Sequence, residues 1–140
     1  MSDNRLFLQH GPIDLILHVD ASEEIRTRLY SCAKKRFSTV LEELVAEMDL
    51  LKLPWSADQT APIGKIAQKM FRAVSNSAVL VTPMAAVAGA VADDMLGNML
   101  FESQNSDSCV DHISRMYVNN GGRHCILAKS RRVIFYWSSR

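Results

Sequence analysis

The chain has few of the residues that mark disulfide-bonded or zinc-binding proteins. It contains three cysteines, Cys32, Cys109 and Cys125, in 140 residues. An odd number without CxxC spacing indicates neither a disulfide framework nor a zinc site. The N-terminal segment lacks a charged start followed by an apolar run and a cleavage site, so no secretion signal is indicated. We therefore expect a cytoplasmic protein.

Acidic residues are missing from the end of the chain. The net charge of +1 and the hydrophobic share of 48% are those of one soluble domain. Residues 1–122 nevertheless carry 11 basic and 15 acidic side chains, a net charge of −4, whereas residues 123–140 carry a net charge of +5 with no acid. This break predicts a boundary after Gly122, followed by a basic tail. The tail belongs to no recognisable nucleic-acid-binding module, so we expect no nucleic-acid partner.

The chain also lacks a long, strongly apolar run. Residues 73–92 carry no charge and are long enough to span a bilayer. They are built mainly on alanine and glycine, which are weakly apolar, and they include several polar residues. We expect a buried strand at residues 78–81 followed by a tightly packed helix, and no membrane partner.

Hydrophobic periodicity predicts a strand pair and two helices. Residues 6–8 and 13–19 are short apolar runs joined by a Gly-Pro turn. Asp20, with Glu23 three residues later, matches a capping box, and the apolar spacing that follows predicts a long amphipathic helix ending before Pro54.

A second helix is expected to open at Pro62, with an apolar stripe that begins at Ile63 and ends at Val74. The charges of both helices are expected to form solvated faces. The basic charges of the second could alternatively lie near an anionic ligand.

A third helix carries the first candidate binding residues. Thr82 suits a helix N-cap and Pro83 the first helical position. The helix should run from residue 84 to about residue 101, and small residues dominate its first turns: Ala85, Ala86, Ala88, Gly89, Ala90 and Ala92. An interior glycine costs about 1 kcal/mol relative to alanine. Gly89 therefore indicates close approach of either a neighbouring helix or a flat ligand, and the amides at the helix start could hold a phosphate.

Two polar features follow this helix start. Asp93 and Asp94 are adjacent, so on a helix they point about 100° apart and cannot both face one metal without help. Asp93 is the candidate metal ligand. Residues 102–111 are mostly polar and are expected to form a loop.

The run Asn119, Asn120, Gly121 and Gly122 follows a candidate strand. It suits a hairpin turn to a strand over residues 124–127. It equally suits a loop whose amides converge on a phosphate or sugar. No Ser/His/Asp or Cys/His arrangement occurs at informative spacing, so no catalytic residue is predicted.

Four segments together resemble a known family. They are GPIDLIL (residues 11–17), RFSTVLEELVAEMDLL (36–51), VTPMAAVAGAVAD (81–93) and YVNNGG (117–122). In this order they resemble an uncharacterised prokaryotic family related to the ApbE-like FAD:protein FMN transferases. The resemblance covers most of residues 5–122.

The resemblance implies an α+β domain, of which this chain holds the N-terminal portion, with long amphipathic helices packed on a small, mostly antiparallel sheet. It implies FAD as ligand and, in the transferase branch, Mg²⁺-dependent transfer of FMN to a hydroxyl of a target protein. Thr82, Pro83, Ala85, Ala86 and Gly89 would form one wall of the FAD site. The run from Asn119 to Gly122 would form the second wall, and Asp93 would contact Mg²⁺.

The chain departs from this family after Gly122. Arg123 stands where the family has aspartate, and family members continue well beyond residue 140. An altered reading frame after Gly122 or a natural basic arm would each account for the ending. The alternative function is therefore a truncated, non-catalytic product that at most binds a ligand. Because an incomplete sheet leaves edges uncovered, a homodimer or other self-association is also expected.

Overall fold

The computed structural model describes residues 4–105, 112–121 and 123–128, the last range by its backbone alone. Four strands form one antiparallel sheet in chain order: β1 (Leu6–His10), β2 (Ile13–Asp20), β3 (Arg115–Asn120) and β4 (Arg123–Ala128). The helices are α1 (Glu23–Ala46), α2 (Met48–Leu51), α3 (Lys65–Val74) and α4 (Val87–Asn105), the last preceded by the 3₁₀ turn η1 (Pro83–Ala86). The expected α+β class, with long helices on a small antiparallel sheet, is confirmed.

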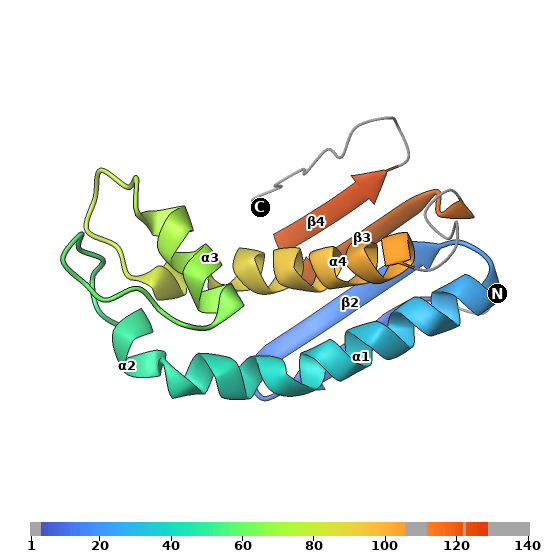
Figure 1. Ribbon diagram of the computed structural model, residues 1–140, viewed down its shortest axis with the longest axis horizontal. Coiled ribbons are helices and arrows are strands. Elements are labelled where there is room, and N and C mark those ends of the chain that lie inside the picture. The colour runs from blue at the N-terminus through green and yellow to red at the C-terminus, as the bar shows by residue number, and fades with distance from the viewer. Residues whose placement is uncertain (1–3, 106–111, 122, 129–140) are drawn as a thin grey trace.

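The elements form two layers (Figure 1). Helices α1 and α4 run beside each other across one face of the sheet, and α3 packs against α4 near one end. Alternation along the strands turns one set of side chains toward the helices: Ile13, Leu15, Leu17 and Val19 from β2, and Met116, Val118 and Asn120 from β3. Because one face of β2 and of β3 is buried and the other is not, the register of these two strands is strongly specified.

Both hairpins turn through glycine. Gly11 and Gly121 each have φ +57°, a conformation that favours glycine. The pairs His10 with Ile13 and Asn120 with Arg123 leave two residues in each turn. The expected hairpin after residue 118 is therefore confirmed, and the domain boundary expected after Gly122 falls between two paired strands of one sheet.

Two expected helix starts were wrong. Asp20 is the last residue of β2, because pairing with Arg115 of β3 extends the strand to that point. Ser22 caps α1 instead, and its hydroxyl accepts a hydrogen bond from the amide of Ile25 at 3.4 Å. Helix α3 begins at Lys65 rather than at Pro62.

The strand expected at residues 78–81 was also wrong. This segment has no strand partner in the described residues, since β1 and β4 form the two edges of the sheet. Val79 is 69% exposed and Leu80 is 82% exposed, so the segment is not buried either. Residues 102–105, expected in a loop, form the last turn of α4, and residues 106–111 lie outside the described residues.

One helix in the described part of the chain is long and apolar enough to cross a membrane. It runs from Pro83 to Asn105 with a mean hydropathy of 1.2. Length and composition alone are weak support for a span, because the core helix of a globular protein has the same properties. Here the helix packs against α1, α3 and β3, which accounts for its apolar composition.

Candidate functional site

A cavity of about 720 Å³ opens between α1, α3 and α4. Ligand pockets in proteins commonly measure about 300–1,000 Å³. The cavity takes residues from all three helices and from the loop before α3: Arg36, Glu43, Ile63, Gly64, Lys65, Lys69, Asp93, Asp94, Gly97, Asn98 and Phe101. Three cations and three carboxylates therefore share this cavity with an apolar rim.

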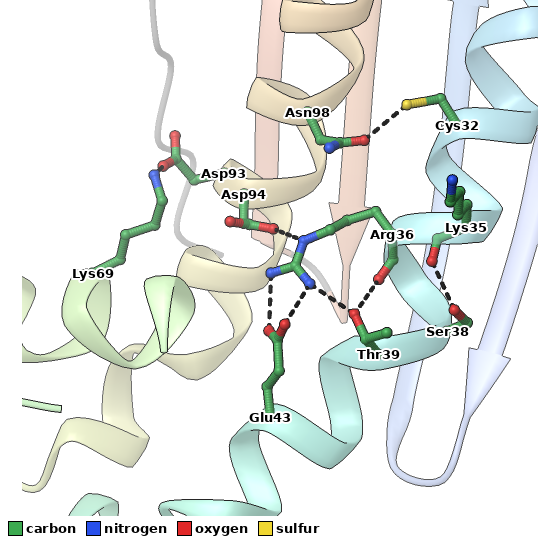
Figure 2. Close-up of polar contacts among 10 residues, drawn as sticks. All are labelled: Cys32, Lys35, Arg36, Ser38, Thr39, Glu43, Lys69, Asp93, Asp94 and Asn98. Carbon is green, nitrogen blue, oxygen red and sulfur yellow. Dashed lines mark hydrogen bonds and ion pairs between the residues drawn. The ribbon is translucent and has the colours of Figure 1, made fainter. Parts of the chain in front are cut away.

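Arg36 joins α1 to α4 at the cavity wall (Figure 2). Its Nε donates a hydrogen bond to Asp94 Oδ2 at 2.8 Å, and Nη1 and Nη2 donate to the two carboxylate oxygens of Glu43 at 3.0 Å each. The side chains of Arg36 and Asp94 are only 15% and 9% exposed. Burial disfavours the charged guanidinium, but the hydrogen bonds and charges of Glu43 and Asp94 outweigh burial and raise the pKa of Arg36 above its ordinary value.

Asp93 points the other way, from α4 toward α3, where it forms an ion pair with Lys69 (Figure 2). Both side chains of this pair are about one-third exposed, at 32% and 33%. The two adjacent aspartates thus serve different partners, as their angular separation on a helix requires. Asp94 is held in a buried network, whereas Asp93 belongs to a pair that water can reach.

A thiol lies beside the same cavity. Cys32 Sγ is 3.0 Å from the Asn98 side-chain oxygen, to which it donates a hydrogen bond. Burial raises the pKa of the Cys32 thiol above its ordinary value, and the negative charge of Glu102 raises it further, while Lys35 opposes the shift. Cys32 is therefore a neutral thiol at physiological pH.

We expect Cys32 to react slowly with iodoacetamide at pH 7.5. Because the thiolate is the nucleophile, raising the pKa lowers the reactive fraction. The rate should rise about tenfold per pH unit above pH 7.5 and should still be rising beyond the ordinary thiol pKa of about 8.5, because the pKa of Cys32 is raised. Time-resolved mass spectrometry of the Cys32 peptide, in native protein and in urea, measures this rate. Equal rates in the two conditions at pH 7.5 would contradict the assignment.

A second cavity, of about 210 Å³, lies between α3 and the start of α4. Its lining is formed mostly by small residues: Lys69, Ala73, Ala86, Gly89, Ala90 and Asp93. Ala86, Gly89 and Asp93, three of the residues that the sequence singled out, therefore lie together here.

The other residues expected from the helix start do not line either cavity. Thr82 occupies the N-cap position of η1, but its side chain makes no capping hydrogen bond. Pro83 is buried and Ala85 is exposed. These three residues thus form the start of the helix as expected, without converging on the cavities.

Residues 119–122 were expected to form the second wall of the FAD site, and of these Asn120 forms a hydrogen bond with α4. Asn120 is 8% exposed, and its Nδ2 donates a hydrogen bond to the backbone oxygen of Ala88 at 3.2 Å. Asn119 points to the other face of β3, and Gly121 is exposed in the turn. Gly122 lies outside the described residues. Asn120 therefore fixes β3 against α4 next to Gly89. None of Asn119, Asn120 and Gly121 lines either cavity.

Comparison with models of protein families shows the family to which the chain belongs. The model of the family described as AbpE bacteria matches residues 1–136. The chain belongs to this family. The match continues past Gly122 and includes most of the basic segment. The family description names no ligand or reaction, and the chain matches none of the curated proteins with which it was compared.

Sequence patterns did not mark most of the residues that line the larger cavity. Arg36 and Glu43 are seven residues apart, which places them two turns apart on one side of α1. That spacing was the available signal. Asn98 and Phe101 follow the small-residue stretch, and no pattern marked them.

The described residues do not form a metal site. No three His, Cys, Asp or Glu side chains converge within the described ranges. Asp93, the expected Mg²⁺ contact, is a single carboxylate already paired with Lys69. Mg²⁺ usually needs one or two carboxylates together with phosphate oxygens. The described side chains therefore do not form a binding site for a resident metal ion.

Proposed function

We propose that this protein binds a phosphate-bearing nucleotide, with FAD as the first candidate, in the larger cavity between α1, α3 and α4. The observation that carries the proposal is the combination of cations and exposed apolar side chains around a cavity of about 720 Å³. Its size suits a nucleotide. The resemblance of four segments to an uncharacterised family related to the FMN transferases supports flavin as the particular nucleotide.

The phosphate would lie against α3. Lys65 and Lys69 are four residues apart and therefore lie on one side of the helix. Both line the cavity. Lys65 is exposed and has no ion-pair partner in the described part of the chain, and Lys69 has only the solvent-accessible pair with Asp93. These two ammonium groups are available to an anion, whereas Arg36 is fully engaged by Glu43 and Asp94.

The planar ring would lie at the rim. Phe101 is 65% exposed and Ile63 is 88% exposed, and both line the cavity. A flat ring placed against Phe101 would remove apolar surface from water and allow aromatic stacking. Gly97 lies one turn before Phe101, and apart from its chain neighbours and the nearby backbone of its own helix, no atom lies within 4 Å of the position its Cβ would take. The absence of a side chain there leaves room beside Phe101 for the ring.

The residues that line the cavity support ligand binding more strongly than catalysis. The lining residues that the structure describes include carboxylates, an amide and amines, but no Ser, Thr, His or Cys side chain. FMN transfer, implied by the resemblance, therefore stays an extension of the proposal. A non-catalytic ligand-binding module is the second candidate, and it is favoured because the described residues hold no cluster of metal ligands for the Mg²⁺ that the transfer uses.

A titration of the protein with FAD, FMN and AMP tests the proposal. We expect saturable binding, with quenched or polarised flavin fluorescence. Replacing Lys65 and Lys69 together by alanine should weaken FAD binding at least tenfold, because both ammonium groups contact the phosphate. Lys34 and Lys52 are exposed and line neither described cavity, so their double alanine variant is the matched control.

Repeating the titration with and without MgCl₂, while following AMP release by chromatography, separates the two candidates. Binding with release of AMP supports the transferase, and binding without release supports the ligand-binding module. If none of the three nucleotides binds, or if the control variant loses as much affinity as the Lys65/Lys69 variant, the proposed site is wrong.

A further inference from the structure

The two cavities share a boundary. Lys69 and Asp93 line both the 720 Å³ cavity and the 210 Å³ cavity. These two side chains come from facing helices, α3 and α4, and they form an ion pair with each other. Figure 2 shows the ion pair between the two helices. Because both of its residues line both cavities, the pair lies at the junction between the two spaces.

This ion pair is more easily opened than the buried pair between Arg36 and Asp94. Its members are about one-third exposed, and among the described residues each forms a hydrogen bond only with the other, so water can replace either partner. Exposed pairs of this kind contribute little to stability. The pair between Arg36 and Asp94 differs, because both side chains are nearly buried and Glu43 also holds the guanidinium. One ion pair of the site is fixed while its neighbour can exchange partners.

We propose that the Lys69–Asp93 ion pair is a gate between two compartments of one binding cleft. A ligand phosphate draws the Lys69 ammonium away from the Asp93 carboxylate and so joins the two cavities. The ligand is then an extended phosphate ester, with its larger part in the 720 Å³ cavity and the group beyond the phosphate in the 210 Å³ cavity. This inference rests on the proposed function and specifies which ligands the site prefers.

The smaller compartment sets a limit on that second group. A dry cavity of about 150 Å³ holds one benzene molecule, so about 210 Å³ accepts a single ring and little more. Apart from the two gate residues, its lining is Ala73, Ala86, Gly89 and Ala90, which offer flat, uncharged surface. A ribose joined to the phosphate through one methylene group meets both limits. In FAD this is the ribose of the AMP half, with both phosphates at the gate beside Lys69 and the adenine extending from the open side of the smaller cavity.

Filling the smaller compartment tests the inference. Ala73 is exposed on α3 and lines the 210 Å³ cavity, so Ala73→Leu should fold normally while occupying part of that space. Wild-type protein should bind FAD more tightly than FMN, because FMN ends at its phosphate. Ala73→Leu should weaken FAD binding about tenfold and leave FMN binding unchanged. Ala46→Leu, at an exposed helical position that lines neither described cavity, is the matched control and should change neither.

The gate itself is tested by Asp93→Asn. Removing the carboxylate releases Lys69, so FAD and FMN should both bind several-fold more tightly. Weaker binding by this variant, or an equal effect of Ala73→Leu on FAD and FMN, or no effect on either, would overturn the inference. Failure of every nucleotide to bind wild-type protein would instead overturn the proposed function, so the two failures are distinguishable. Equal urea midpoints for the variants show that folding is not the cause.

Discussion

Replacing Arg36 by leucine is expected to lower the free energy of unfolding by about 3 kcal/mol. The substitution leaves the carboxylate of Asp94, which is 9% exposed, without its cationic partner. It also removes two hydrogen bonds to Glu43 and the link between α1 and α4. Removing one member of a buried ion pair is costly because the remaining charge stays desolvated. Urea unfolding followed by circular dichroism measures the change.

Two further variants show whether the charge is the cause. The double replacement Arg36→Leu with Asp94→Leu should recover more than half of the loss, since an apolar pair of similar volume often substitutes well for a buried ion pair. Lys34→Leu, at an exposed position of the same helix, should change stability by less than about 0.5 kcal/mol. If Arg36→Leu costs no more than Lys34→Leu, the buried network does not stabilise the fold.

Glu47→Ala is expected to cost about 2 kcal/mol and to loosen the start of α3. The Glu47 carboxylate accepts hydrogen bonds from the amides of Ile63 at 2.6 Å and Gly64 at 2.9 Å. Helix α3 has no acidic residue in its first turn, and its N-cap residue, Gly64, makes no side-chain capping bond. Glu47 therefore supplies from the end of α1 the cap and the negative charge that α3 lacks.

Glu47→Ala should destabilise the start of α3 more than the rest of the protein. Hydrogen exchange of the first α3 amides should accelerate more than that of β2 amides. Glu47→Gln keeps one acceptor oxygen without the charge, so its loss should be intermediate. Glu42→Ala, at an exposed position of α1, is the control and should leave exchange in α3 unchanged. Uniform acceleration throughout the protein would contradict a capping role.

The same contact explains one wrong expectation about the fold. Proline at residue 62 is a common first helical residue, so the local pattern favoured a helix start there. The distant carboxylate instead holds the amides of Ile63 and Gly64, and the helix begins only at Lys65. Ile63, which matched the apolar stripe of the helix, therefore lies outside it, 88% exposed at the rim of the larger cavity.

Composition predicted the small-residue face of α4, but it did not predict which element lies opposite that face. Small side chains at Ala86, Gly89 and Ala90 indicated close approach of some group to the backbone, and these residues do line a cavity. Composition could not identify which neighbour forms the opposite wall. That wall is Ala73 of α3, which follows only from how α3 packs against α4. Whether Gly89 and its neighbours contact a flavin stays a prediction.

Local signals by themselves determined the α+β class, the two glycine hairpins and the approximate positions of the long helices, although the first helix, expected to continue to before Pro54, ends at Ala46 and is followed by the separate α2. They did so because alternation, helical periodicity and positive-φ turns each involve residues close together in the chain. The tertiary structure alone decided which charges meet. Arg36 lies 58 positions from Asp94, and Lys69 lies 24 from Asp93. Ion pairing at such separations depends on helix packing, which no local pattern encodes, so the charged cleft emerged only from the fold.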